Sequence, residues 1–226
     1  MIIAIDGPAG AGKSTVCKLL AKKLGFLYLD TGAMFRALAW ALLQEKGYLH
    51  LDGLGEYLPG LPLHFSISES SLKIHYKGSQ LNEELRSPEI SDAASRISQL
   101  QPVRSFLLTW QRKLAEQGDI VAEGRDTATV VFPKADLKIF LTADLPTRIK
   151  RRRDEYIEKG LNISYEEMER SIRDRDEADM NRDLAPMRPA EGAVVVDSSQ
   201  LDIMGVVDRL AEAARARMKL DRTTYH

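Results

Sequence analysis

The chain has little of several things that would mark it as a secreted, metal-binding or membrane protein. Its one cysteine, Cys17, excludes an intrachain disulfide, and its four histidines, at positions 50, 64, 75 and 226, show neither metal-ligand spacing nor a nucleophilic triad. No apolar run approaches the length of a membrane span, and the opening strand-like segment leaves no space for a signal peptide. We therefore expect a cytoplasmic protein with no membrane partner.

The chain also lacks an excess of positive or negative charge, since its formal net charge is −1. Nothing in the overall charge favours nucleic acid or an anionic membrane. The 226 residues include 44% hydrophobic and 29% charged side chains, as in an ordinary soluble globular protein. This length predicts one domain, or one core with an insertion. No exposed apolar stripe is evident, so we expect a monomer.

The most specific segment is a glycine-rich loop near the N-terminus. It follows the apolar run 2–6 and precedes a helical pattern with Val16, Leu20 and Leu24 on one face. Small residues let backbone N–H groups surround a polyphosphate, while the helix N-terminus and a lysine add positive charge. The sequence therefore predicts a nucleoside triphosphate site, with the Ser14 or Thr15 hydroxyl in reach of Mg²⁺. The predicted loop residues are Gly7, Pro8, Ala9, Gly10, Ala11, Gly12, Lys13, Ser14 and Thr15.

Short apolar runs alternate with helical patterns along the rest of the chain. Five runs are typical of buried parallel strands: 2–6, 26–30, 119–123, 136–142 and 193–197. Helical spacing is found over 32–46, 103–116 and 203–219. This alternation predicts an α/β fold with a five-stranded parallel sheet, helices on both faces and ligands beyond the C-terminal strand ends.

Two segments interrupt the alternation. Residues 60–85 alternate between apolar and polar side chains on either side of a polar turn, which predicts a small antiparallel β insertion. Residues 147–183 are rich in charges of both signs and contain the capping-box sequence Ser164-Tyr165-Glu166-Glu167, which predicts a helical, mobile lid. The domain prediction is one unit with core segments 1–59, 86–146 and 184–220, the insertion 60–85 and the lid 147–183. The polar tail 221–226 is expected to fray.

Arginines follow several of the predicted strands. Transfer of a phosphoryl group to another phosphate needs positive charge rather than a general base, because the acceptor is already an anion. Arg36 lies one turn into a predicted helix, Arg104 lies in the first turn of another, and Arg125 follows the third strand in chain order. Each could instead be solvent-exposed or part of a structural ion pair. Either Asp126 or Glu123 could order the water shell of Mg²⁺.

The lid begins with a second group of arginines. Arg148 shares a helix face with Arg151 and with Arg152, and we expect these side chains to reach the triphosphate, whereas Arg153 fits a solvated face. Closure of such a lid would exclude water and suppress hydrolysis of ATP.

Taken together, these motifs resemble the bacterial cytidylate kinases, which are nucleoside monophosphate kinases. The resemblance covers essentially the whole chain. It rests on the glycine-rich loop, Leu29-Asp30-Thr31-Gly32-Ala33-Met34, Ala94-Ser95, Pro102-Val103-Arg104, Gly124-Arg125-Asp126, Thr129-Val130-Val131-Phe132-Pro133 and Arg173-Asp174-Arg175-Asp176 with Asp179, Asn181 and Arg182.

The resemblance implies a P-loop NTPase fold that transfers the γ-phosphate of ATP, with Mg²⁺, to CMP or dCMP. Arg36, Arg104, Arg125 and Arg182 match positions that grip the acceptor phosphate. Ser95 and Arg175 match the base-recognising pair, and Asp179 matches the pentose-hydroxyl partner. Combined with the reasoning from the residues, the predicted catalytic residues are Lys13, Arg125, Arg182, Arg148 and Arg152; the predicted acceptor site also includes Thr31 and Asp126, and Ser14 is the predicted metal contact.

The sequence departs from the family pattern at three places: Phe35, where tyrosine is more usual, the pair Thr127-Ala128, and Lys134.

Two other functions compete with the interpretation as a nucleoside monophosphate kinase. A small-metabolite kinase of the shikimate or gluconate type would need a base carboxylate for a hydroxyl acceptor. A nucleotide-gated switch would lack a second nucleotide pocket.

Overall fold

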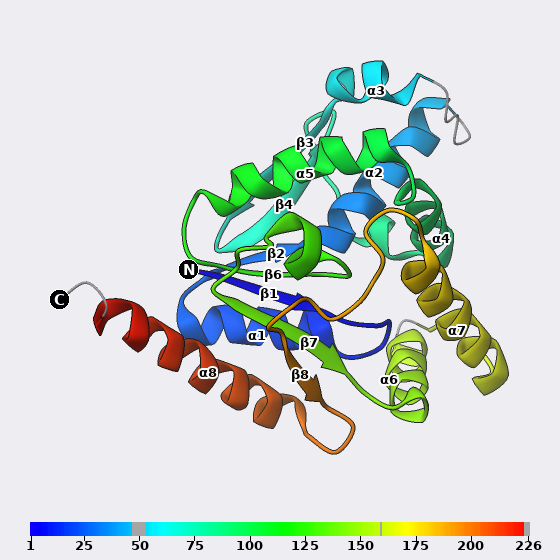
Figure 1. Ribbon diagram of the computed structural model, residues 1–226. Helices are drawn as coiled ribbons and strands as arrows, with labels where there is room; N and C mark the ends of the chain where they lie inside the picture. The colour runs from blue at the N-terminus through cyan, green and yellow to red at the C-terminus, as the bar shows by residue number, and fades with distance from the viewer. Residues whose placement is uncertain (47–52, 159, 224–226) are drawn as a thin grey trace.

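The computed structural model describes residues 1–46, 53–158 and 160–223, and it shows one sheet with helices on both faces (Figure 1). Within these residues the strand order is β3-β4-β2-β6-β1-β7-β8, with β5 paired to β4. The strands are β1 (Ile2–Asp6), β2 (Leu27–Asp30), β3 (Leu63–Ser68), β4 (Ser71–Tyr76), β5 (Ser79–Gln80), β6 (Ile120–Gly124), β7 (Leu137–Thr142) and β8 (Val194–Asp197). The helices are α1 (Lys13–Leu24), α2 (Thr31–Lys46), α3 (Leu54–Tyr57), α4 (Pro88–Ile97), α5 (Gln101–Ala115), α6 (Leu145–Glu158), α7 (Tyr165–Asn181) and α8 (Ile203–Thr223).

The five central strands β2, β6, β1, β7 and β8 are all parallel, which confirms the predicted α/β sheet. Each observed strand agrees with its predicted range to within one residue at either end. Asp6, the last residue of β1, lies between Gly124 of β6 and Phe140 of β7. The C-terminal ends of these strands therefore meet at one edge, where the loop after β1 begins.

Two apolar clusters hold the helices to the sheet. On one face, α1 and α8 pack over the central strands, and Cys17, Leu20 and Val207 lie fully buried or nearly so in that cluster (Figure 1). On the other face, α2, α4 and α5 bury a second cluster that includes Leu38 and Leu107. Burial of one such large side chain contributes about 1.5–3 kcal/mol to folding. These clusters fix the helix ends that carry the site.

The predicted β insertion is confirmed as an antiparallel hairpin of β3 and β4. Glu69 and Ser70 turn the chain with φ of 51° and 59°. The hairpin also extends the main sheet, through one parallel pair between Tyr28 and Ser71. Phe65 is buried in the same cluster as α2, so the insertion shares the core of the protein.

The lid consists of α6 and α7, which lie beyond the C-terminal strand ends (Figure 1). The Ser164–Glu167 capping box is present as predicted. A small apolar cluster of Ile149, Met168 and Ile172 joins the two helices. Residue 159 of the lid prediction lies outside the described residues.

The C-terminal helix is longer than expected. Helix α8 continues to Thr223 and so includes residues 221–223 of the polar tail, whereas residues 224–226 lie outside the described part; the expected fraying stays a prediction. Helix α4 was not among the expected helices; Ser87 caps it by accepting the backbone N–H of Ile90 at 3.2 Å. No helix in the described residues is long and apolar enough to cross a bilayer.

Candidate active site

The glycine-rich loop is pressed between β7 and α6. Gly7 has φ of 151°, and a Cβ at this position would lie 1.9 Å from the carbonyl oxygen of Leu141. Gly10 has φ of 74°, and a Cβ there would lie 2.7 Å from the carbonyl oxygen of Arg148. Both positions need a residue without a side chain, because of the positive φ and the close backbone. The loop is thus held in one shape by the sheet and the lid together.

Lys13 lies inside this loop with only 6% of its surface exposed. Its Nζ donates hydrogen bonds to the carbonyl oxygens of Gly7 and Pro8, each at 2.7 Å. Burial, followed by the nearby guanidinium of Arg125, lowers the pKa of Lys13 to about 7. An anion beside Lys13 would favour its charged form, as a phosphate-binding lysine requires.

A hydrogen-bonded set lies next to the loop. The Ser14 hydroxyl donates to Glu123 Oε2 at 3.0 Å, and the Tyr28 hydroxyl donates to Glu123 Oε1. Burial raises the pKa of Glu123, and the Asp30 carboxylate adds to that effect. The hydroxyl and carboxylate oxygens are hard donors of the kind that Mg²⁺ prefers, so these residues fit the expected metal contact. Among the described residues, no group of three or more His, Cys, Asp and Glu side chains has the arrangement of a metal site of its own.

The turn after β6 is fixed by Asp6. Its two carboxylate oxygens accept the backbone N–H groups of Thr127 at 2.8 Å and Ala128 at 2.7 Å. Burial raises the pKa of Asp6, while these two hydrogen bonds oppose the rise. The pair Thr127-Ala128, which departs from the family pattern, thus lies in a turn that Asp6 holds through backbone N–H groups rather than through the two side chains. This turn positions Arg125 and Asp126.

Three arginines surround Asp179 of α7. Its carboxylate pairs with Arg125 at 2.9 Å, Arg175 at 3.4 Å and Arg182 at 3.5 Å. Burial alone would raise the pKa of Asp179, but the three guanidinium groups hold it below its usual value. Burial, followed by repulsion from Arg125, lowers the pKa of Arg175. One carboxylate therefore faces three cations, and the remaining positive charge can hold an anion.

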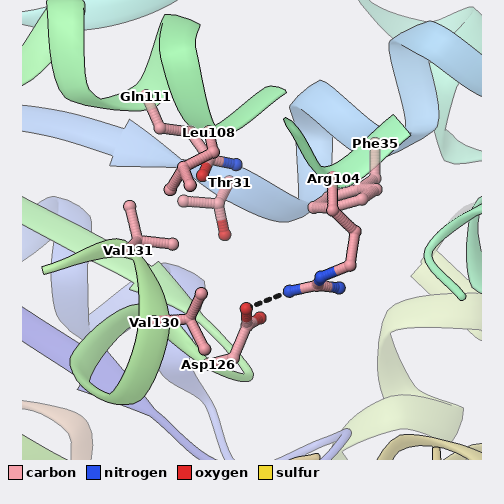
Figure 2. Close-up of a pocket in the computed structure, with 8 residues that line it drawn as sticks. All are labelled: Thr31, Phe35, Arg104, Leu108, Gln111, Asp126, Val130 and Val131. Carbon is pink, nitrogen blue, oxygen red and sulfur yellow. Dashed lines mark hydrogen bonds and ion pairs between the residues drawn. The ribbon is translucent and has the colours of Figure 1, made fainter. Parts of the chain in front are cut away.

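Asp126 forms a second cluster. It pairs with Arg104 and, at 3.2 Å, with Arg182. Arg104 also donates to the carbonyl oxygen of Ser98 at 2.9 Å. Figure 2 shows Asp126 facing Arg104 across a pocket with Phe35 on the arginine side. The cavity has a volume of about 20 Å³, and its walls are Thr31, Phe35, Arg104, Leu108, Gln111, Asp126, Val130 and Val131.

The first two turns of α2 hold two of the predicted residues, Thr31 and Arg36. Asp30 accepts the backbone N–H of Ala33 at 2.8 Å and pairs with Arg36 at 3.1 Å. Asp30 therefore caps this helix. The Thr31 hydroxyl instead donates to the carbonyl oxygen of Glu123 at 2.6 Å, which joins α2 to β6.

Ser95 lies on α4, the helix that faces α7. Across this boundary, Arg175 donates to the carbonyl oxygen of Ser91 at 3.3 Å. Ser91 and Ser95 are one helical turn apart and share a face. The carbonyl oxygen of Ser95 accepts the Ser98 hydroxyl at 2.7 Å. The structure thus brings Ser95 close to the arginine clusters, and its role stays a prediction.

The lid contacts the loop through Arg148 and Asp176. Arg148 Nη1 donates to the carbonyl oxygen of Ala9 at 3.0 Å and also pairs with Asp176. The Asp176 carboxylate accepts the backbone N–H of Ala9 at 3.0 Å. The loop is thereby covered by one cation and one anion of the lid.

Arg151 supplies a further lid contact. Its guanidinium donates to the Ser198 hydroxyl at 2.9 Å, to the Ser198 carbonyl at 2.8 Å and to the Ala11 carbonyl at 3.5 Å. Arg152 instead pairs with Glu155 at 2.7 Å and lies over the ring of Tyr156. The structure therefore brings Arg151 to the loop rather than Arg152, and a catalytic role for Arg152 stays an untested prediction.

The sequence reasoning missed Asp176, Tyr28 and Ser198. Asp176 belongs to the Arg173–Asp176 motif, so the sequence did point to it, but no function was predicted for it. Tyr28 lies within a predicted strand, and its contact with Glu123 depends on the pairing of β2 with β6. Ser198 follows β8 and meets Arg151 only because of the fold.

The histidines in the described residues have structural surroundings. His64 lies edge-on to the Trp110 ring, with the ring centroids 5.2 Å apart. His75 pairs with His64 across the hairpin. His50 and His226 lie outside the described residues.

The fold and the phosphate loop define a P-loop kinase. A parallel sheet, a glycine-rich loop between β1 and α1, and an arginine-rich lid at the strand ends form its site. A solved structure of an uncharacterized protein from Eubacterium ventriosum is similar in fold alone, with a TM-score of 0.54 and 13% identity, covering 96% of this chain and 98% of that one.

Comparison with known sequences identifies the family. The family model for cytidylate kinase matches residues 3–216. A cytidylate kinase of Thermotoga maritima is 44% identical over 216 residues, covering 96% of this chain and 97% of that protein. Another, of Carboxydothermus hydrogenoformans, is 44% identical over 213 residues, covering 94% and 96%. The chain therefore belongs to the cytidylate kinase family and is an ATP-dependent phosphotransferase.

Proposed function

We propose that ATP binds at the loop 7–15, that CMP or dCMP binds over the two arginine clusters, and that the γ-phosphate passes between them. The observation that carries this proposal is the pair of buried carboxylates, Asp179 and Asp126, each facing more than one arginine beside the phosphate loop. One cluster suits a phosphate, and the other suits a base that carries both donors and acceptors.

On the donor side, backbone N–H groups of the loop and Lys13 hold the triphosphate. Lys13 lies within reach of the loop carbonyls, so it can turn its charge towards the β- and γ-phosphates. Ser14 would hold Mg²⁺, with Glu123 behind it through the hydrogen bond at 3.0 Å. When bound, the metal neutralises charge on the phosphates.

On the acceptor side, Arg125 and Arg36 grip the monophosphate, as the resemblance implied. Arg175, which the resemblance implied for the base together with Ser95, is assigned to the phosphate here, because burial and the repulsion from Arg125 and Arg36 favour an anion beside it. Asp179 balances part of this charge. It remains the proposed partner of a pentose hydroxyl.

The base is assigned to the pocket in Figure 2, which revises the expectation that Arg104 and Arg182 grip the phosphate. The Asp126 carboxylate, which pairs with both, would repel a phosphate. Cytosine presents an amino donor beside the acceptors N3 and O2, whereas uracil presents a carbonyl and an N–H. Asp126 would accept the amino group, and the arginines would donate to the acceptors. Because the cavity is about 20 Å³, the ring enters as the Arg104–Asp126 pair opens.

In the transfer step, an oxygen of the CMP phosphate attacks the γ-phosphorus, and the bond from that phosphorus to the bridging oxygen of ADP breaks. No base is needed, because the attacking oxygen is an anion. Lys13 and Arg125 lie close enough for their charges to influence each other, so both can stabilise the charge of the transferring group. The lid excludes water from this group.

The test is an ADP-release assay with ATP–Mg²⁺ and CMP, dCMP, UMP, AMP or GMP. We expect fast release with CMP and dCMP, slow release with UMP and none with purine nucleotides. Release with shikimate or gluconate instead would favour a metabolite kinase. Slow ATP hydrolysis that no monophosphate stimulates would favour a nucleotide-gated switch.

A further inference from the structure

A second, larger hollow is lined in part by the C-terminal half of α1. Its volume is about 720 Å³, within the range of pockets that bind small molecules. One wall comes from α1 and β2, and the other comes from β4, β5 and the segment after them, so the hollow spans the joint between the core and the insertion. We call it the insertion groove.

The floor of the insertion groove is apolar and its rim is positively charged. Phe26, Ile74 and Leu85 contribute buried surface to the floor. The lining contains five cationic side chains and two acidic ones, a local excess of three positive charges in a chain of net charge −1. The cations are Lys18, Lys22, Arg36, Lys73 and Arg86, and the acids are Asp30 and Glu69.

The cations of α1 are the ones that can meet a ligand. Lys18 and Lys22 are one helical turn apart, and both are exposed. Lys18 lies over the Tyr28 ring at 5.7 Å from its centroid. Lys73, Arg36 and Arg86 are each already paired with a carboxylate. A concave, positively charged surface concentrates anions, and an apolar floor suits a planar ring.

We propose that the insertion groove is a second, non-catalytic site for a nucleoside triphosphate. The size, the positive rim and the apolar floor together fit a ligand that carries several negative charges and one flat apolar group. Arg36 lines the groove and also pairs with Asp30 at the start of α2. A ligand in the groove therefore contacts the element that carries an acceptor-site residue, which couples the two sites.

The test counts bound nucleotide. Equilibrium dialysis with labelled, non-hydrolysable AMPPNP, in the presence of saturating CMP and Mg²⁺, is expected to give two equivalents per chain. The double variant Lys18→Glu with Lys22→Glu is expected to keep the first equivalent and to weaken the second at least tenfold. Hydrogen exchange of residues 71–76 should slow as the second equivalent binds, and this slowing should be lost in the double variant.

A matched variant, Arg209→Glu with Arg217→Glu, makes the same change of charge on exposed positions of α8. It should keep both equivalents. One equivalent in the wild-type protein, two unchanged equivalents in the Lys18/Lys22 variant, or equal loss in the α8 variant would each overturn the proposal. The CMP phosphorylation assay is independent of this count, so failure of the groove leaves the proposed reaction untouched.

Discussion

The backbone N–H of Ala9, in the phosphate loop, donates to the carboxylate of Asp176, on the lid, at 3.0 Å. The same carboxylate pairs with Arg148, whose guanidinium donates to the carbonyl of Ala9. A loop N–H and a lid arginine are groups that a triphosphate would use. Asp176 therefore holds, from within the chain, contacts that the substrate competes for.

The variant Asp176→Asn is expected to bind ATP more tightly. Removing the negative charge weakens a charge-assisted hydrogen bond, so the competition falls by about 1 kcal/mol, or roughly fivefold in Kd. Titration calorimetry with AMPPNP measures this directly. Asp174→Asn, at an exposed position of the same helix, is the control and should leave Kd unchanged. Weaker binding in Asp176→Asn would show that the carboxylate instead positions Arg148 for the substrate.

ATP binding is expected to take up a proton near pH 8 through Lys13. Its pKa is about 7 in the folded protein, lowered chiefly by burial, so at pH 8 it is mostly neutral. The triphosphate stabilises the charged form and raises this pKa, so a proton enters as ATP binds. Calorimetry in buffers of different ionisation enthalpy counts the protons. At pH 6 the lysine is already charged, and its uptake should vanish.

The lowered pKa of Lys13 also makes the stability of the fold depend on pH. Between pH 7 and 10.5 the unfolded chain holds a proton on Lys13 that the folded chain lacks, so this residue makes the free energy of unfolding rise with pH across that window.

Lys13→Arg is the control for the proton uptake on ATP binding, because arginine stays charged at these pH values. If Lys13→Arg takes up the same number of protons at pH 8, the uptake does not come from Lys13.

Arg125→Ala is expected to lower turnover about 10²–10³-fold while ATP still binds, since a cation aligned with the transferring phosphate acts mainly in the transition state. Steady-state kinetics with saturating CMP separates kcat from the KM for ATP. Arg173→Ala, an exposed arginine paired with Glu169, should behave like the wild type. Near-normal kcat in Arg125→Ala would remove Arg125 from the site.

Asp126→Asn tests the assignment of the base pocket. An amide can donate as well as accept, so it should tolerate the O4 carbonyl of uracil, and the preference for CMP over UMP should fall about 100-fold. The readout is the ratio of the two kcat/KM values, which a general loss of stability would not change. If kcat/KM falls equally for CMP and UMP, so that their ratio is unchanged, Asp126 has a structural role only.

Much of the sheet could be predicted because buried parallel strands are short, apolar and ended by turn residues. β1 and β7 show this pattern, and their predicted and observed ranges nearly coincide. Helix α4 does carry a signal in the sequence, because Ser87 and Pro88 open it and Ile90, Ala93, Ala94 and Ile97 follow at helical spacing, but it was not among the expected helices. The pairing of β4 with β2 rests on a single residue pair and leaves no pattern in the sequence.

The candidate site likewise contains residues that local spacing predicts and residues whose contacts depend on the fold. The glycine-rich loop could be predicted as a candidate phosphate site because its residue spacing is itself the signal. Arg151 and Arg152 are neighbours on α6 with equal charge, and only the three-dimensional packing turns Arg151 towards Ser198 and Arg152 towards Glu155. Partners more than a hundred residues apart in the chain, such as Asp6 with Thr127, follow from strand order, which local patterns do not specify.

The position of Cys17 has a practical consequence. It is the only cysteine of the chain, it is fully buried beneath α8, and burial raises its pKa well above the usual value. Its thiol is therefore shielded from reagents that attack thiolates. A cysteine introduced at an exposed lid position such as Glu166, and another at the exposed Lys77 directly after β4, would accept fluorescent dyes without removal of the native cysteine. The distance between lid and insertion could then be followed in single molecules during turnover.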